Sequence, residues 1–491
     1  MVKRSREPRN KDDKFVIMEG DCKHKLSDIE DASVSLVFTS PPYNIGKVYE
    51  SSKVSLDDYL AEQKEIIYIL ASKIKNGGSV CWQVGNSVTK GAVIPLDLKV
   101  HPLFIEAGFT LHRRFVWAVG HGLHCTNRFS GRHETISWYT KGPTPATPPH
   151  FPADFVEIEW ELARFDVTNV KYRHPEKTNH PCQFPIELVE RFILTLTDEG
   201  DTVLDPFCGA GTTPLAAVRH DRIGIGIELM PEYTSIAKDR HTMFLNGQLR
   251  VREMGTPIFD HSKDKQSKRP AAWEGVINPS LAAEEAYDSE TSSSHTDLAI
   301  LYPYIAVDTF SAENFVTSIN EKHRERMEFP WKDGKEGNVC IVIDHGVNGF
   351  RAAESEIFDE MTRTSWLLRN RIVVCNKGRH GVYTSIMWFQ KENTEAPFDL
   401  DAVRVPSKYP GKRCIRSEKF SGNPLGKNPS DVWNDCCGSC DVHMGLSECH
   451  WRRVVRSLST IGSVVNATND EAKFDSFRDI FHSVKRVVAC P

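Results

Sequence analysis

One stretch limits what this chain can fold into more than any other, the thirteen residues from Asp201 to Thr213 that read DTVLDPFCGAGTT. A short apolar run ends on Asp205, a turn containing Gly209 and Gly211 follows, and Pro214–Val218 then has the apolar spacing of a helix. Glycine lacks a Cβ atom and adopts positive φ, so such a turn lets backbone N–H groups approach a nucleotide-like cofactor. The stretch predicts a strand, a glycine-rich turn and a helix within an α/β sheet.

An acidic residue follows at the distance that a ribose-binding site requires. The segment Arg222–Glu228 reads RIGIGIE and predicts a second strand that ends on Glu228. In dinucleotide-binding folds an acid about 20 residues beyond the glycine turn contacts ribose hydroxyls. The turn and the acid together predict a cofactor that carries a ribose.

A second motif lies far upstream, where Thr-Ser-Pro-Pro-Tyr at 39–43 directly follows the apolar run 34–38. Its residues suit a planar amine, whose lone pair is delocalised into the ring and is a weak nucleophile. Ser40 offers a hydroxyl acceptor, Pro41 and Pro42 fix the backbone so that carbonyls can point at the amine, and Tyr43 offers a face for stacking. Taken alone, the motif fits a plain proline turn with a packed tyrosine, and it is the glycine turn later in the chain that favours a loop that positions an extruded base.

The Ser-Pro-Pro-Tyr motif after a strand, followed later by Asp-Pro-Phe-x-Gly-x-Gly, resembles the amino-group DNA methyltransferases. The order of the two motifs is that of their permuted beta group, and the resemblance covers about residues 14–245. It implies a Rossmann-like, mixed and mostly parallel α/β sheet and S-adenosyl-L-methionine as the cofactor. It also implies double-stranded DNA as the partner, with a cognate restriction endonuclease in a restriction–modification setting.

The resemblance also assigns roles to single residues. The catalytic residues that it implies are Ser40, Pro41, Pro42 and Tyr43. The cofactor-binding residues are Asp21, Phe184, Asp205, Phe207, Gly209, Gly211, Thr212 and Glu228. For Asp21 a plain turn residue is an equal alternative, and for Phe184 an ordinary core residue is.

Ser40 bears on which base is methylated. Family members with serine at this position mostly modify the N4 atom of cytosine, and members with aspartate mostly modify the N6 atom of adenine. We therefore expect a cytosine-N4 DNA methyltransferase, with adenine-N6 as the alternative. An RNA methyltransferase on the same fold and a non-catalytic DNA-binding module also remain open.

Length and composition set the remaining bounds. A chain of 491 residues predicts two or three domains, and the net charge of −5 gives no overall attraction to nucleic acid. The 13 cysteines are scattered and odd in number, which favours reduced thiols. We find no apolar run of membrane-spanning length and no signal peptide, so we expect a cytoplasmic, nucleoid-associated protein without a membrane partner. The sequence does not specify the oligomeric state.

The C-terminal half repeats the first half imperfectly. We expect a disordered tail at 1–13, a catalytic domain at 14–249, a linker at 250–296 and a degenerate α/β domain at 297–491. Five short matches in the same order support the repeat, which begins by pairing 297–304 with 33–43 and ends by placing Ala467 where Asp205 stands. The alternative is an unrelated α/β accessory domain.

Two sets of residues in this half could bind ligands. The DNA-binding candidates are Arg404, Lys408, Lys412, Arg413 and Arg416, for which a solvated surface loop is the alternative. The zinc candidates are Cys437, Cys440, Cys449 and His450, for which free thiols are the preferred alternative. Methyl transfer itself needs no metal.

Two expectations concern local structure. A helix capped by Ser55 should run through Ile74 and stop at Asn76–Gly78, and the proline-rich segment Lys141–Glu159 should be a loop.

Overall fold

The structure is a computed structural model. It describes residues 14–46, 54–119, 125, 127–171, 174–256, 296–301, 311–317, 338–344, 350–375, 384–392 and 398, with short pieces between 432 and 488. The chain divides into two compact units. The first unit comprises Met1–Val88, Ile94–His121 and His133–Ile258, and the second comprises Thr89–Val93, Gly122–Arg132 and Phe259–Pro491.

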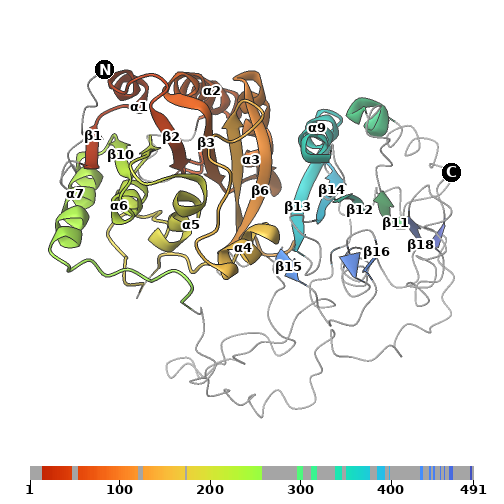
Figure 1. The fold of residues 1–491 in the computed structure, drawn as a ribbon. Helices are drawn as coiled ribbons and strands as arrows, with labels where there is room; N and C mark the ends of the chain where they lie inside the picture. The colour runs from red at the N-terminus through yellow and green to blue at the C-terminus, as the bar shows by residue number, and fades with distance from the viewer. Residues whose placement is uncertain are drawn as a thin grey trace, which may run out of the picture. The chain divides into compact units, whose positions relative to one another are not determined.

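The first unit is built on an eight-stranded sheet with the order β1-β10-β9-β2-β3-β7-β6-β8 (Figure 1). Its strands are β1 Phe15–Glu19, β2 Val34–Thr39, β3 Ile74–Val84, β6 Phe109–Ala118, β7 His133–Lys141, β8 Arg164–Phe165, β9 Thr202–Asp205 and β10 Ile223–Glu228. The five strands from β1 to β3 are parallel, and β7 runs antiparallel to both of its neighbours. The mixed, mostly parallel α/β sheet expected from the sequence is confirmed.

Helices cover both faces of this sheet. Their bounds are α1 Cys22–Lys25, α2 Leu56–Lys73, α3 Leu96–Glu106, α4 Asp154–Glu161, α5 Ile186–Leu196, α6 Thr212–Arg219 and α7 Pro231–Leu245, and η2 Leu26–Asp28 is a 3₁₀ turn. The helices α1, α2 and α3 share one apolar core with β2 and β3, and α5 and α6 pack together on the other face (Figure 1). All six residues of β2 are buried, as a central strand between two helical layers requires.

Local sequence explains where these helices begin. The Ser55 hydroxyl accepts the Asp58 N–H at 3.1 Å and caps α2, and Pro231 opens α7, where its missing N–H costs nothing. The last turn of α2 differs from our expectation, because the helix ends at Lys73 and Ile74 already belongs to β3.

Two other local features differ from the sequence reading. The segment expected to be a loop contains α4, because its prolines end at Pro152 and leave Asp154–Glu161 free to form a helix that buries Val156 and Trp160. A hairpin of β4 Asn86–Thr89 and β5 Ala92–Pro95 was also not expected.

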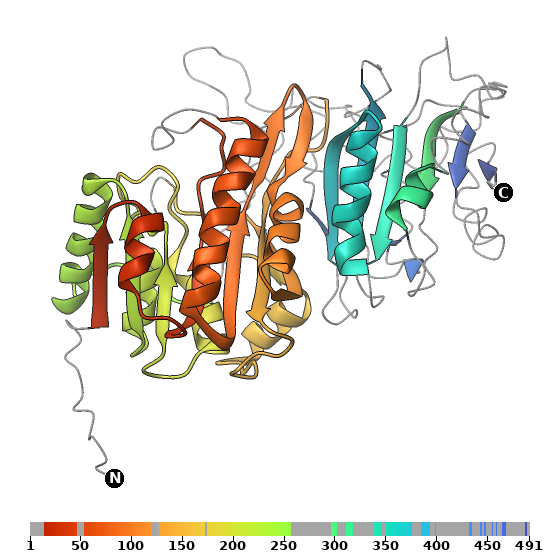
Figure 2. The ribbon, with the colours of Figure 1, turned by 90° about the horizontal axis from the view of Figure 1, so that it is seen from above.

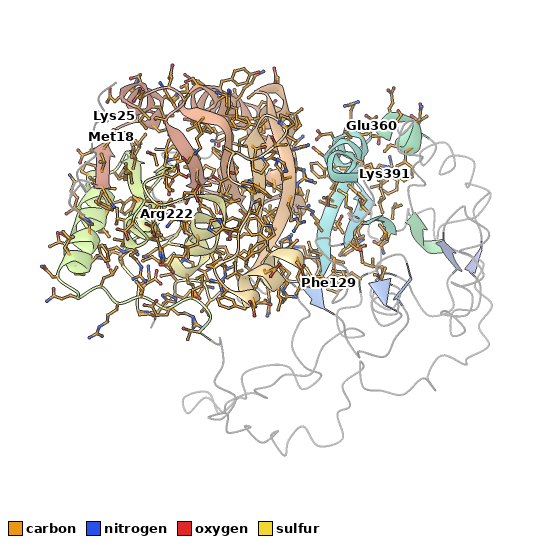
Figure 3. The ribbon with its side chains drawn as sticks, in the orientation of Figure 1. Met18, Lys25, Phe129, Arg222, Glu360 and Lys391 are labelled. Atoms are coloured by element: carbon orange, nitrogen blue, oxygen red, sulfur yellow. The ribbon has the colours of Figure 1, made fainter. Side chains whose placement is uncertain are left out.

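A buried arginine joins the helical layer to the sheet. Arg222, labelled in Figure 3, donates to the Thr197 carbonyl at 2.6 Å and to the His220 carbonyl at 2.7 Å. These bonds link the ends of α5 and α6 to the start of β10. They satisfy carbonyl groups that a helix end would otherwise leave without partners.

The second unit contains a seven-stranded sheet with the order β15-β13-β14-β12-β11-β18-β19. Its elements are β11 Thr296–Leu301, β12 Asn338–Asp344, α9 Phe350–Arg363, β13 Trp366–Cys375, β14 Thr384–Lys391, β15 Val432–Asn434, β18 Val464–Ala467 and β19 Val487–Val488, with a separate pair β16 Val442–His443 and β17 Leu446–Ser447. The helix α9 packs against β12 and β13 (Figure 2). Across the described residues of both units, we find no helix with the length and apolar character needed to span a bilayer.

Candidate active site

The two sequence motifs follow neighbouring strands of the first sheet. β9 lies between β10 and β2 and runs parallel to both, so the carboxyl ends of the three strands meet at one edge. There the Thr39 hydroxyl donates to Asp205 Oδ1 at 2.6 Å, although the two residues are 166 positions apart. The serine–proline loop and the glycine turn therefore start side by side.

The glycine turn is compact because both glycines adopt conformations that other residues disfavour. Gly209 has φ of +50° and Gly211 has φ of +71° and caps α6. A Cβ atom on Gly209 would lie 2.8 Å from the His180 ring, and one on Gly211 would lie 2.7 Å from the Ala237 side chain. Larger residues would therefore be both strained and crowded at these positions.

Asp205 is fully buried at the start of this turn. Its Oδ1 accepts from the Thr39 hydroxyl and from the Phe207 N–H at 3.1 Å, and its Oδ2 makes no hydrogen bond with the described residues. Burial raises the pKa of this carboxyl group to about 6, the nearby Glu228 charge adds to the effect, and hydrogen bonds to the carboxylate oppose it. A buried carboxylate oxygen without a partner suits a ligand that brings a cation, such as the amine of S-adenosylmethionine.

Glu228 ends β10 and closes the other side of the turn. One carboxylate oxygen accepts from the Gly209 N–H and the other from the Met230 N–H, both at 2.8 Å. Burial raises the pKa of this carboxyl group. Each oxygen keeps a second lone pair, so the carboxylate can also accept from ribose hydroxyls.

Asp21 lies close by at the end of the neighbouring strand. β1 pairs with β10 so that Glu19 is opposite Glu228, and Gly20 donates to the Glu228 carbonyl at 2.9 Å. The Asp21 side chain caps α1 by accepting the Lys23 N–H at 2.8 Å. Asp21 is thus at the expected edge of the sheet, where it also has a structural role.

The serine–proline loop is anchored by a hydrogen-bonded cluster around Tyr43. The Ser40 hydroxyl lies 2.9 Å from the Tyr43 hydroxyl, which donates to Glu134 at 3.0 Å and accepts from the Gln83 amide at 3.1 Å. Gln83 also donates to Glu134. The cluster fixes the tyrosine ring through its hydroxyl group.

Burial changes the acidity of this cluster. It raises the pKa of Tyr43 well above its usual value, with the Glu134 charge adding to the effect, and it also raises the pKa of Glu134. A carboxylate with a raised pKa is a stronger base than an exposed one. Ser40, Tyr43 and Glu134 form a continuous path from the serine hydroxyl to a half-buried proton acceptor.

Sequence reasoning missed Glu134 and Gln83. Gln83 is the last residue but one of β3, which lies next to β2, and Glu134 is the second residue of β7, which lies next to β3. The sequence shows each of them as a polar residue near a strand end, but only the sheet order shows that the two residues meet at Tyr43.

The remaining candidates of the first unit lie around the turn. Phe184 is 8% exposed and its ring centroid is 5.8 Å from that of Phe38, and Phe207 packs edge-on against Trp82. The Thr212 hydroxyl donates to the Phe184 carbonyl at 3.4 Å and accepts from Arg240 at 3.1 Å. These contacts fit core packing, and they also place all three residues beside the glycine turn.

The candidates of the second half lie outside the described residues. The DNA-binding set is Arg404, Lys408, Lys412, Arg413 and Arg416, and the zinc set is Cys437, Cys440, Cys449 and His450. Within the residues that the structure describes, no cluster of histidine, cysteine or acidic side chains could hold a metal ion.

Known proteins resemble this chain over the part that carries the two motifs. A family described as DNA methylase, of the N6 and N4 type, matches residues 34–239. The Type II methyltransferase M.BglII of Bacillus subtilis is 40% identical over 245 residues, which cover 45% of this chain and 67% of M.BglII. The DNA adenine methyltransferase YhdJ of Escherichia coli is 29% identical over 251 residues, which cover 46% of this chain and 81% of YhdJ. Among solved structures, the cytosine-N4-specific PvuII DNA methyltransferase has a TM-score of 0.41 and 24% identity, and the likeness covers 48% of this chain and 93% of that one.

Proposed function

Because the chain belongs to the S-adenosylmethionine-dependent amino DNA methyltransferases of the N4 and N6 type, we propose that it methylates the N4 atom of cytosine within a specific duplex sequence. The observation that carries this proposal is the hydrogen bond from Thr39 to Asp205. It joins the base-positioning loop to the cofactor turn at one edge of the sheet, where a single methyl group can pass between two ligands.

The cofactor side of the site is formed by residues around the glycine turn. The free Oδ2 atom of Asp205 accepts from the cofactor's amine, and Glu228 accepts from its ribose hydroxyls. Gly209 and Gly211 allow the tight, left-handed turn that faces the cofactor, and Phe207 and Thr212 shape this turn. At the adenine end, Asp21 and Phe184 contact the ring. Bound there, S-adenosylmethionine supplies a methyl group on a positively charged sulfur.

The base side of the site is formed by the serine–proline loop. Ser40 accepts a hydrogen bond from the exocyclic amine, and Pro41 and Pro42 hold backbone carbonyls toward it. The face of Tyr43 stacks on the flipped base, in an orientation fixed by its hydroxyl group.

The cluster around Tyr43 gives the released proton a route out. As the amine nitrogen bonds to the methyl carbon, the carbon–sulfur bond breaks and the nitrogen must lose one proton. That proton passes to the Ser40 oxygen, the Ser40 proton passes to the Tyr43 oxygen, and the Tyr43 proton passes to Glu134. Glu134 is therefore the general base in this proposal, and its partial burial raises its pKa and so increases its basicity.

Ser40 is the reason to favour cytosine over adenine. Serine is a weaker hydrogen-bond acceptor than aspartate, and the serine form of the motif is typical of cytosine-N4 enzymes. Adenine-N6 is the second candidate, because YhdJ is named as a DNA adenine methyltransferase.

We extend the proposal to the second half of the chain. Its basic segment from Arg404 to Arg416 neutralises DNA phosphates, while the first unit carries out the chemistry. Because M.BglII is named as a Type II methyltransferase, we also propose a restriction–modification setting with a cognate endonuclease.

Analysis of modified bases in DNA tests the proposal. DNA from cells that express the chain is digested and examined by mass spectrometry, and sequencing locates the modified site. We expect N4-methylcytosine at one short sequence, and we expect none in cells that express Ser40→Ala or Asp205→Asn. N6-methyladenine would move the assignment to the second candidate, and unmodified DNA would contradict both.

A further inference from the structure

The sheet of the second unit repeats the order and direction of seven strands of the first. Starting from β8, the first sheet runs β8-β6-β7-β3-β2-β9-β10, and the second runs β15-β13-β14-β12-β11-β18-β19. In both sheets the first strand is parallel to the second, the third is antiparallel to its two neighbours, and the last four are parallel. Only β1 of the first sheet lacks a counterpart among the described strands.

An irregularity in strand pairing shows which residues of the two sheets are equivalent. In the first unit the pairing shifts by one residue between Leu111 and Arg113, which face Tyr139 and Trp138. In the second unit it shifts between Leu368 and Asn370, which face Phe389 and Trp388. A bulge at the same step of the same hairpin is a specific feature, because it re-aims the residues around it.

A buried tryptophan makes the same hydrogen bond in both sheets. Trp138 faces Cys81 and donates to the Ser79 hydroxyl at 3.1 Å. In the second unit Trp388 faces Cys340 and donates to the Asn338 side chain at 2.7 Å. In each case the acceptor lies two residues before the cysteine.

A buried ion pair between the hairpin and the preceding helix is also repeated. Arg114 of β6 lies 3.6 Å from Asp97 of α3, and both side chains are at most 2% exposed. Arg371 of β13 donates through two nitrogens to Glu354 of α9, each at 2.7 Å. The two residues of each pair are 17 positions apart.

The turn between helix and strand agrees as well. Gly108 precedes β6 with φ of +85°, and Ser365 precedes β13 with φ of +67°. A serine in this conformation is unusual and is retained where the surrounding structure requires it. Strand order, bulge, tryptophan, ion pair and turn are five separate agreements at one register.

From these agreements we infer that the second unit is a duplicated methyltransferase fold that has lost its cofactor and catalytic residues. β2 pairs with β9, the strand before the cofactor turn, through Leu36 and Val203, and β11 pairs in the same way with β18 through Leu298 and Val465. Two residues further on, Ala467 holds the place of Asp205, so the copy has no carboxylate for the cofactor's amine.

The base-binding end of the copy has lost its polar cluster too. By the register of β12 and β14, Val342 takes the place of Gln83 and Thr384 takes the place of Glu134. Tyr302 follows β11, where Ser40 follows β2. The chain therefore contains one competent site and one site that binds no cofactor.

Cofactor counting tests the loss of the second site, and this part rests on the proposed role of Asp205. We expect isothermal titration of the full chain with S-adenosylmethionine to give one site per chain, and to give the same single site with a lower affinity for Asp205→Asn. Two sites per chain would overturn the inference, whereas a single site with unchanged affinity in Asp205→Asn would contradict the proposed role of Asp205. A chain that binds no cofactor at all would contradict the proposed function instead, and the duplication would then be decided by cross-linking.

Cross-linking tests the duplicated sheet without reference to the cofactor. Ala299 of β11 pairs with Asn466 of β18, so cysteines at both positions of the full chain should form a disulfide that peptide mapping detects. Val488 lies one strand further away in β19, so the matched pair Ala299→Cys and Val488→Cys should not form one. A disulfide in the second pair, or its absence in the first, would show that the strand order is not that of a methyltransferase sheet.

Discussion

The hydroxyl of Tyr43 connects Ser40 to Glu134, so replacing the carboxylate of Glu134 tests the proposed proton path. Glu134→Gln keeps an oxygen that accepts from Tyr43 but removes the proposed general base. We expect kcat to fall by about 10²- to 10⁴-fold, the usual contribution of a general base. Binding of S-adenosylmethionine should not change, because Glu134 contacts Tyr43 of the serine–proline loop and lies outside the glycine turn.

The pH profile separates a proton acceptor from a structural residue. The raised pKa of Glu134 means that the active ionised form is lost as the pH falls, so the wild-type rate should drop toward low pH. The slow Glu134→Gln enzyme should lack this drop. A variant that is slow and has the wild-type profile would assign the proton to another group.

Asp205 gives a second prediction, because its pKa is about 6. The cofactor's amine is positively charged between pH 5 and 7, and it is attracted only by the ionised carboxylate. Affinity for S-adenosylmethionine should therefore weaken as the pH falls below about 6, by at most roughly tenfold per pH unit. Titration calorimetry at pH 5, 6 and 7 measures this change.

Stability without cofactor should change in the opposite direction. The unfolded Asp205 ionises near its usual pKa of about 4, whereas the folded one ionises near 6, so this residue costs stability as the pH rises between them. Asp205→Asn should consequently bind cofactor poorly at every pH and still melt no earlier than the wild type at pH 7. Early melting would mean that Asp205 is needed for folding.

At the scale of elements, β10 and α6 approach so closely that Gly224 has no room for a side chain. A Cβ atom there would lie 2.3 Å from the Pro214 carbonyl oxygen, which is backbone and cannot move alone. Gly224→Ala should lower the free energy of unfolding by about 3 kcal/mol, as overpacking does, and should weaken cofactor binding by shifting the turn.

Gly247→Ala is the matched control for this change. Gly247 has φ of +67° and nothing within 4 Å of an added Cβ, so the cost should be only about 1 kcal/mol of left-handed strain. Chemical denaturation of both variants measures the difference. Similar losses would mean that crowding between α6 and β10 is not what requires glycine.

The same elements explain what could be predicted from sequence. The strand β9, the glycine turn, α6 and β10 follow one another directly along the chain. The apolar run, the two glycines and Glu228 were therefore enough to predict them. The meeting of Gln83, Glu134 and Tyr43 depends on the order of strands from distant parts of the chain, and no local pattern encodes that order. The helix α4 was missed because the prolines before it masked its own apolar spacing.

The whole chain has a net charge of −5, whereas its substrate, DNA, is a polyanion. Electrostatic attraction to DNA must therefore come from local basic segments. The segment from Arg404 to Arg416 contains five arginine and lysine residues and lies outside the described residues. Each phosphate contact releases counterions. The loss of one contact therefore reduces the magnitude of the slope of log affinity against log salt by about 0.9.

Replacing Arg404, Lys408, Lys412, Arg413 and Arg416 with glutamine should therefore weaken duplex binding and flatten its salt dependence, while cofactor affinity stays unchanged. The matched control replaces a basic run of similar charge in the predicted linker with glutamine, namely Lys263, Lys265, Lys268 and Arg269. Fluorescence anisotropy with a labelled duplex at several salt concentrations compares the two variants. Equal weakening of DNA binding in the two variants would mean that overall charge alone explains the effect. An unchanged slope in the variant of 404–416 would place the whole DNA contact elsewhere, because phosphate neutralisation cannot be lost without a change in slope.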